Sequence, residues 1–153
     1  MKCKDEIEPI DLLPSATQTG KNTFGCLING EPFTPDELAS SLSVQYSSND
    51  EKYFYLSAIR NTDNIIVSPA FGVVNLPIVE GKRYNLSIKE EDDAYGLLYI
   101  KSEFIYTYKN YGELFISKHD TERRIISGTF WFNARSRTAA LYRITEGRFD
   151  IKY

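Results

Sequence analysis

Three carboxylates in the C-terminal third of the chain are the residues whose chemistry could support hydrolysis. Asp120, Glu122 and Asp150 share this region with His119, the single histidine of the sequence. Hydrolysis by carboxylates needs two such groups facing each other across a cleft of about 5–10 Å. No Gly-x-Ser-x-Gly nucleophile motif occurs, and His119 lies among polar residues that are typical of a solvated hairpin tip. A secreted carboxylate-dependent hydrolase is therefore kept as an alternative. The sequence leaves open whether the protein is an enzyme and favours a non-enzymatic role.

The run Glu90–Asp93 is the densest cluster of carboxylates in the sequence. Clustered carboxylates can bind calcium, but this spacing matches no EF-hand loop, and contiguous residues cannot all direct their side chains inward. We interpret the run as a solvated loop. The sequence also lacks paired cysteines and histidines at zinc-binding spacing. It therefore predicts no metal site, no cofactor and no identified catalytic residue.

Outward-facing aromatic side chains give the strongest indication of a binding function. Trp131 lies between Phe130 and Phe132, so strand alternation places it on the opposite face from them. Tyr53 and Tyr55 share the outer face of an earlier strand in the same way. Exposed aromatic rings can stack on sugars or anchor a protein partner. Cross-strand aromatic pairs also stabilise sheets without a ligand, by about 0.2–1 kcal/mol each. The candidate ligand-binding residues are Trp131, Tyr53 and Tyr55.

Charge and hydropathy exclude two kinds of partner. The 153 residues carry a net charge of −3 with no basic face implied, so nucleic acid is not an expected ligand. No apolar run approaches the roughly 20 residues of a membrane helix. Arginines gather at expected turn and outer-face positions of the C-terminal third, where charge can protect strand edges from aggregation. Contact with an anionic glycan has no further support from the sequence. These residues are Arg123, Arg124, Arg135, Arg137 and Arg143.

The elements that must position these side chains are β-strands. Tyrosine and phenylalanine dominate a 14% aromatic fraction, and short runs rich in β-branched and aromatic residues favour strands. Turn residues recur every 8–12 residues or so, and no βαβ alternation occurs. We predict an all-β fold, an antiparallel β-sandwich or flattened barrel of about nine to eleven strands. At most one short helical turn is expected, over Thr34–Ala39. Three pairs of expected strands are separated by short breaks: 65–68 and 71–74, 104–108 and 113–118, and 139–144 and 148–153.

The domain is expected to span residues 23–153, after a polar tether of residues 1–22. Asn29-Gly30 predicts a tight hairpin, and Gly147 is expected in a tight turn before the last strand. Gly128 is expected to mark a bulge or a close backbone approach. Alternation assigns a set of side chains to the core: Phe24, Phe54, Leu56, Phe130, Phe132, Phe149 and Ile151.

The two cysteines have different expected roles. Cys26 lies in an apolar run and is expected to be a small buried hydrophobic residue. Cys3 lies in a charged, proline-containing segment with no obvious packing partner, so a disulfide between the two is not expected. Its position is typical of the lipidated cysteine of a bacterial lipoprotein whose signal peptide has been removed. Met1 and Lys2 are too short to be that peptide, and without a leader Cys3 would be an unmodified cytosolic residue.

Two parts of the sequence resemble a family of uncharacterised lipoproteins from Bacteroidetes-type bacteria. They are Leu13–Gly30, and Ile126–Phe132 together with Ile144–Tyr153. In that family a lipidated cysteine precedes a Leu-Pro-Pro-Ala-Thr-Gln-Thr-Gly segment, and the β domain ends in Gly-Arg-Phe-Asp. Ser15 stands here where proline is usual. The resemblance implies an extracytoplasmic β domain with no known activity, and Cys3-Lys4-Asp5-Glu6 is similar to the surface-export signal of such bacteria.

We therefore expect a lipid-anchored extracytoplasmic β domain, held at the outer membrane or cell surface by a lipid on Cys3. Its expected role is non-enzymatic binding of a glycan or a protein. The alternatives are the hydrolase above and a structural subunit of a cell-envelope assembly. A concave aromatic face around Trp131 would favour binding, and a long unpaired edge strand would favour assembly.

Overall fold

The computed structural model describes residues 6–87 and 93–153, and Cys3 and most of the acidic run Glu90–Asp93 lie outside this range. The described chain is all β, as predicted, apart from two single 3-10 turns, Pro9–Leu12 (η1) and Ala39–Ser41 (η2). The strands are β1 (Thr23–Ile28), β2 (Glu31–Phe33), β3 (Leu42–Ser47), β4 (Tyr53–Ala58), β5 (Arg60–Thr62), β6 (Ile65–Val74), β7 (Arg83–Asn85), β8 (Ala94–Ile100), β9 (Glu103–Asp120), β10 (Ile125–Arg135) and β11 (Leu141–Lys152).

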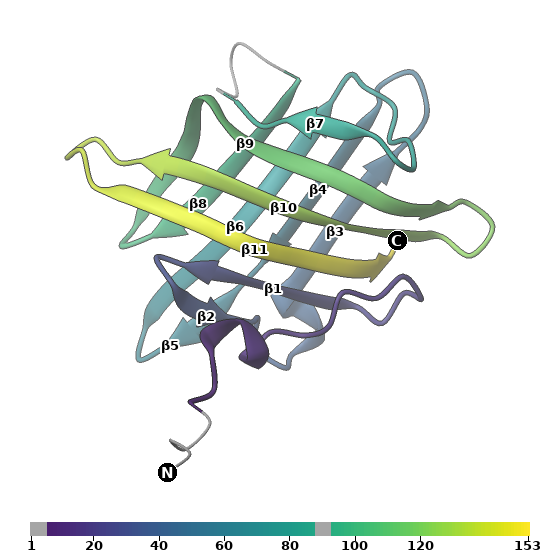
Figure 1. Ribbon diagram of the computed structural model, residues 1–153. Helices are drawn as coiled ribbons and strands as arrows, with labels where there is room; N and C mark the ends of the chain where they lie inside the picture. Colours follow the sequence, from purple (N-terminus) through teal and green to yellow (C-terminus); the bar gives the residue numbers. More distant parts are fainter. Residues whose placement is uncertain (1–5, 88–92) are drawn as a thin grey trace.

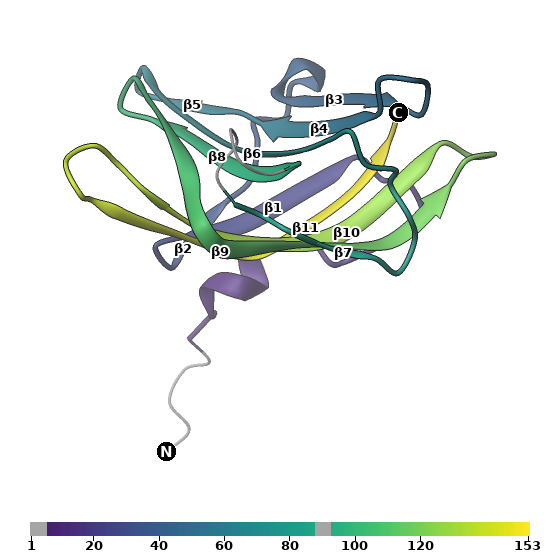
Figure 2. The same ribbon diagram turned by 90° about the horizontal axis from the view of Figure 1, so that it is seen from above.

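The strands form one curled antiparallel sheet in the order β2-β1-β11-β10-β9-β8-β6-β4-β3. β5 pairs with β6, and β7 pairs with β9. The sheet folds over at β9 into two layers whose strands cross (Figures 1 and 2). Layer A consists of β2, β1, β11, β10, β7 and the second half of β9, and layer B consists of β3, β4, β5, β6, β8 and the first half of β9. This half-barrel confirms the predicted antiparallel fold class.

β9 joins the two layers because it changes partners along its length. Residues 103–106 pair with β8, whereas residues 112–120 pair with β10. The register on β10 jumps between these parts, since Phe132 pairs with Gly112 and Ala134 pairs with Thr107. The extra residues on β9 form an irregular stretch of the kind that bends a strand. The expected strands 104–108 and 113–118 are therefore one long bent strand.

Two other expected breaks are also absent. β6 continues through Pro69. On one side of β6 the partner strand changes at this point, since Val67 pairs with β5 and Ala70 pairs with β4. Proline lacks the N–H that a strand interior needs, so this change of partner is a position that tolerates it. β11 continues through Gly147, so the predicted tight turn there is wrong. Because the flanking residues keep their partners, Thr145–Gly147 form a bulge within the strand.

The core lies between the two layers and is rich in phenylalanine. All of the predicted core side chains are buried, with exposed fractions of 3% or less. Phe71 is a central contact, because its ring centroid lies 5.1–5.7 Å from those of Phe54, Phe130 and Phe149. Rings from both layers therefore interlock, as expected for aromatic pairs at this spacing.

The predicted helical turn at Thr34–Ala39 does not form, and the short η2 turn follows it instead. Asp36 explains the difference, since its N–H donates to the carbonyl of Ile59 and its carboxylate accepts the N–H of Asn61. These bonds hold the segment in an extended loop along β4 and β5. The predicted Asn29-Gly30 hairpin does form between β1 and β2, and both residues have positive φ.

Candidate functional site

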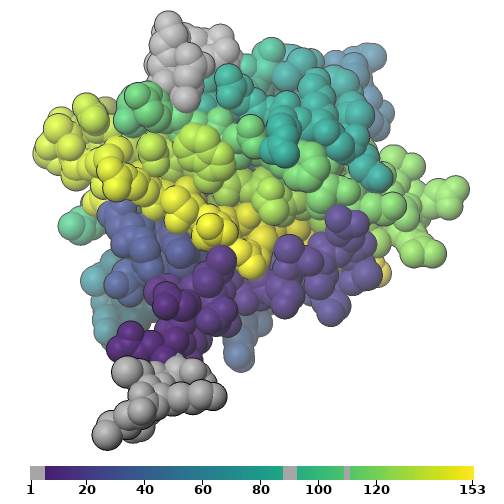
Figure 3. All heavy atoms as spheres, in the orientation of Figure 1, coloured from purple at the N-terminus to yellow at the C-terminus, as the bar shows by residue number. Residues whose placement is uncertain are grey.

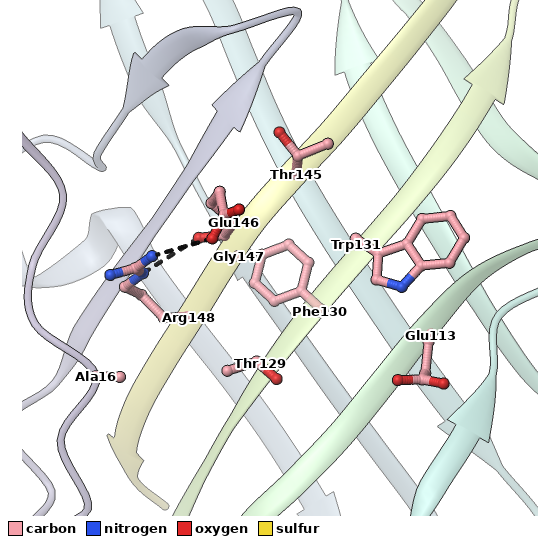
Figure 4. Close-up of a pocket in the computed structure, with 9 residues that line it drawn as sticks. All are labelled: Ala16, Glu113, Thr129, Phe130, Trp131, Thr145, Glu146, Gly147 and Arg148. Carbon is pink, nitrogen blue, oxygen red and sulfur yellow. Dashed lines mark hydrogen bonds and ion pairs between the residues drawn. The ribbon is translucent and has the colours of Figure 1, made fainter. Parts of the chain in front are cut away.

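The strongest candidate site is a pocket of about 460 Å³ on the outer face of layer A. Trp131 on β10 forms one wall and is 42% exposed, as its predicted outward position requires. Phe130 and Gly147 lie at the floor, between Trp131 and the side chains of β11 (Figure 4). The full lining is Ala16, Glu113, Thr129, Phe130, Trp131, Thr145, Glu146, Gly147 and Arg148.

The bulge in β11 creates the wall opposite Trp131. Glu146 adopts a φ of 52°, and its ion pair with Arg148 has a nitrogen–oxygen distance of 3.6 Å. Gly147 allows the bulged backbone to lie directly against Phe130, because a Cβ there would lie 2.5 Å from the Phe130 carbonyl oxygen. Bulges commonly redirect side chains beside functional sites. Here the bulge presents a carboxylate and a guanidinium group beside the pocket.

β9 and β7 supply the charged groups on the other side of Trp131. Glu113 pairs with Trp131 across the strands and forms an ion pair with Arg83. The indole nitrogen of Trp131 lies on the ring edge that is turned toward Glu113 (Figure 4). The guanidinium carbon of Arg83 lies 4.6 Å from the centroid of the Phe115 ring. The pocket thus combines an exposed aromatic face with polar groups suited to bind hydroxyls.

The remaining wall comes from the N-terminal strap, which we define as residues 16–21. Its anchor is Asp150 on β11, which is fully buried. Asp150 accepts hydrogen bonds from the Thr17 hydroxyl at 2.6 Å and from the backbone N–H groups of Thr19, Gly20 and Lys21 at 2.7–3.1 Å. The strap lies along the outer face of layer A beside β11 (Figure 3). The part of the expected tether nearest to β1 is therefore bound to the domain, and it brings Ala16 to the pocket.

Asp150 has a structural role that occupies both of its carboxylate oxygens. The Ser127 hydroxyl donates a further hydrogen bond at 2.7 Å. Burial alone would raise the pKa of Asp150, but the hydrogen bonds from Thr17, Ser127 and the strap backbone outweigh it and lower the pKa to about 2. An ionised carboxylate with this many donors is suited to fix a segment in place. It is poorly suited to transfer protons.

The other two candidate carboxylates lie at the turn between β9 and β10. Asp120 accepts the N–H groups of Glu122 and Arg123. The hydrogen bond from Arg123 is the largest cause that lowers the pKa of Asp120. The nearby positive charge of Arg123 and the hydrogen bond from Glu122 lower this pKa further. Asp120 therefore stabilises the turn, and the hydrolase alternative gains no support from either group.

His119 is not a solvated loop residue, and that interpretation is wrong. It lies within β9, where neighbouring strands bring it against two tyrosines. Its Nδ1 lies 2.9 Å from the Ile78 carbonyl oxygen, and its Nε2 lies 3.3 Å from the Tyr153 hydroxyl. Its ring centroid is 5.4 Å from that of Tyr46 on β3. His119 thus belongs to an aromatic cluster that links layers A and B.

Tyr53 and Tyr55 do not join the Trp131 pocket. Both lie on β4 with their side chains on the outer face of layer B, where Tyr53 is 39% exposed and Tyr55 is half-buried. Burial raises the pKa of Tyr55. The two layers turn their outer faces in opposite directions (Figure 2). A single small ligand therefore cannot contact all three predicted residues.

Sequence reasoning missed Glu113, Arg148 and the strap as parts of the pocket. Glu113 and Trp131 are neighbours only because of the strand register. Arg148 reaches the pocket because it directly follows the bulge Thr145–Gly147, where the sequence instead predicts a tight turn at Gly147. A glycine beside charged residues within an otherwise alternating strand is the signal that could have indicated a bulge.

Cys26 is fully buried, as predicted, and it is a free thiol among the described residues. Burial raises its pKa to about 12. In the same part of the chain, no group of three or more His, Cys, Asp or Glu side chains could hold a metal ion. The described residues also contain no helix long and apolar enough to cross a membrane. Comparison with protein-family models, curated proteins and solved structures finds no match to this chain.

Proposed function

We propose that the protein is a lipid-anchored extracytoplasmic module that binds glycan, without catalysis, at the pocket beside Trp131. The observation that carries this proposal is the half-exposed indole of Trp131 next to the ion-paired carboxylates Glu113 and Glu146. Sugar rings stack on aromatic faces, and their hydroxyls form charge-assisted hydrogen bonds with carboxylate and guanidinium groups. A volume of about 460 Å³ also suits a small ligand.

A glycan fits this pocket better than a protein hot spot does. Hot spots bury an aromatic anchor within a dry, largely apolar surround. Here Trp131 is surrounded by Thr129, Thr145 and two ion pairs. Those groups would have to be desolvated against a protein surface, whereas the hydroxyls of a sugar can replace their water.

The glycan proposal is tested by measuring binding of the purified protein to an array of oligosaccharides, followed by calorimetry on the best ligands. Trp131→Ala should weaken binding by about tenfold or more, since stacking contributes roughly 1.4 kcal/mol or more at such a site. Tyr53→Ala is the matched control, because Tyr53 is similarly exposed on the opposite layer. Equal losses in both variants, or no binding to any glycan, would contradict the proposal.

The proposed location rests on Cys3 and on the resemblance to bacterial lipoproteins. Labelled palmitate should be incorporated when the full gene, with its own upstream codons, is expressed in the native host. Cys3→Ser should abolish the label and release the protein from the membrane fraction. Label retained by Cys3→Ser would show that this cysteine is not the anchor.

An envelope-assembly subunit is the second candidate, and β3 is the observation that favours it. β3 pairs with β4 alone among the described strands, so its other edge is open over Leu42–Ser47. The opposite edge of the sheet is the short strand β2, whose Pro32 restricts further pairing. Light scattering on the purified protein would separate the candidates. A monomer at high concentration would disfavour self-assembly through β3.

A further inference from the structure

The outer face of layer A continues beyond the Trp131 pocket along β10. Strand alternation places Trp131, Asn133 and Arg135 on this face, while Phe132 and Ala134 are buried. At about 3.3 Å per residue, the path from Trp131 to Arg135 measures roughly 13 Å. This length exceeds a single sugar ring and suits an oligosaccharide chain.

The neighbouring strand β9 lines the same path with aromatic rings. Glu113 lies opposite Trp131. The next position, Gly112, faces the core, because a Cβ placed on it would contact Phe132. Tyr111 therefore lies on the outer face and is 46% exposed. Its ring centroid is 4.4 Å from that of Tyr108. Aromatic surface thus continues from the pocket to the bend of β9.

A second hollow, of about 920 Å³, lies at the far end of this path, between the start of β9 and the hairpin that joins β10 to β11. The guanidinium carbon of Arg135 lies 5.1 Å from the Tyr108 ring centroid. Arg137 lies on the hairpin, where its backbone N–H donates to Glu103. Phe104 also lines the hollow and is 63% exposed.

The arginines along the path differ in whether a carboxylate forms an ion pair with them. Arg83 and Arg148 are ion-paired with Glu113 and Glu146. Within residues 6–87 and 93–153, by contrast, no ion pair engages the exposed residues Arg135, Arg137 and Arg143. Arg143 pairs with Asn133 across β10 and β11, so it flanks the middle of the path. This positive charge without ion pairs stands out on a chain whose net charge is −3, although the Glu103 carboxylate also lies in the hollow.

We propose that the glycan is an acidic polysaccharide, whose uronate carboxylates bind Arg135, Arg137 and Arg143 while its sugar rings follow the path from Trp131 past Tyr111. This inference rests on the proposed function and names its ligand class. A guanidinium group binds a carboxylate in a bidentate, charge-assisted manner. Nucleic acid fits less well, because its phosphates attract proteins through many cations at once, and the path offers few arginines.

The test compares polygalacturonate, alginate and hyaluronate with the methyl-esterified form of each, using affinity electrophoresis and calorimetry. At least one polyuronate should bind about tenfold more tightly than its neutral ester, and added salt should reduce the difference. Arg135→Gln, Arg137→Gln or Arg143→Gln should each weaken polyuronate binding several-fold and leave ester binding unchanged. Circular dichroism and urea unfolding establish that each variant is folded.

Arg123→Gln is the matched control, because it removes the same charge from an exposed side chain at the opposite end of β10. An equal loss in this control would reduce the effect to general electrostatics and overturn the inference. Equal affinity for all polyuronates and their esters would also overturn it. If neutral glycans still bind through Trp131, the proposed function stands without this inference. If no glycan binds, both fail.

Discussion

The hydroxyl of Thr17 donates a hydrogen bond of 2.6 Å to the carboxylate of Asp150, a residue 133 positions later in the chain. This bond joins the N-terminal strap to the last strand of the chain, β11. Both segments contribute to the Trp131 pocket, through Ala16 and Arg148 respectively. The N-terminal strap is thus part of the folded domain and of its candidate site.

Replacing the strap anchor should destabilise the protein. In Asp150→Asn, one carboxylate oxygen becomes an N–H₂ group that faces hydrogen-bond donors inside the fold. We expect a loss of about 2–4 kcal/mol in the free energy of unfolding, measured with urea. Limited proteolysis should also cut the strap faster. Asp11→Asn, at an exposed position, is the control. An unchanged unfolding midpoint in Asp150→Asn would mean that the strap is not held by this residue.

Acid should weaken the protein in a defined pH range. The pKa of Asp150 falls from its ordinary value of 3.8 to about 2 on folding. The ionised carboxylate therefore stabilises the folded state fully above about pH 4, and this contribution disappears as the pH falls through about 2. It amounts to about 2 kcal/mol. Urea unfolding between pH 6 and pH 2 should show this loss in the wild type. A loss of the same size in Asp150→Asn would assign it to other groups.

Adjacent residues on β10 should respond very differently to truncation. Phe130 is 3% exposed and contacts Phe24, Phe71 and Phe149, so Phe130→Ala should cost about 3–5 kcal/mol. Trp131→Ala should cost less than about 1.5 kcal/mol, because its side chain is outside the core. Urea unfolding of both variants measures the contrast. Similar losses would mean that Trp131 is a packing residue and would weaken its assignment to a ligand.

Gly128 should tolerate no side chain. A Cβ at this position would lie 2.1 Å from the carbonyl oxygen of Phe115 on β9, so β9 and β10 would have to separate. Gly128→Ala should therefore cost about 2–3 kcal/mol. Gly30→Ala is the comparison, since its φ is +82° and nothing lies within 4 Å of an added Cβ. It should cost only about 1 kcal/mol, from backbone strain. The reverse order, in thermal unfolding, would contradict the observed strand approach.

Much of the local structure could be predicted from residue types alone. Period-two alternation placed Phe54, Phe130 and Phe149 in the core and Trp131 outside it, because a strand allows each side chain only one of two faces. Asn29-Gly30 predicted a hairpin, since both residues accept positive φ. The close approach expected at Gly128 is confirmed. These features depend on nearest neighbours in the chain, and such neighbours are visible in a sequence.

The bends and breaks were less predictable. Pro69 and Gly147 both indicated interruptions. β6 nevertheless runs through Pro69 because β8 pairs with it without a break, and β11 runs through Gly147 because β1 and β10 pair with it before and after the bulge. The helical turn expected at Thr34–Ala39 does not form, because Asp36 is hydrogen-bonded to Ile59 and to Asn61 on β5. His119 has polar neighbours in the sequence, which predict a solvated position, but in the fold it contacts Tyr46 and Tyr153. In each case a partner distant in sequence overrode a local preference.

The sequence by itself therefore determined the fold class, the core side chains and the outward position of Trp131, because all of these follow from the alternation along single strands. Only the tertiary structure decided which residues surround Trp131, and that Tyr53 and Tyr55 lie on the opposite layer. It also decided that Asp150 anchors the strap. The physical reason is strand register, which sets lateral neighbours through backbone hydrogen bonds between distant segments. A one-residue shift in that register would have assembled a different set of side chains around the same tryptophan.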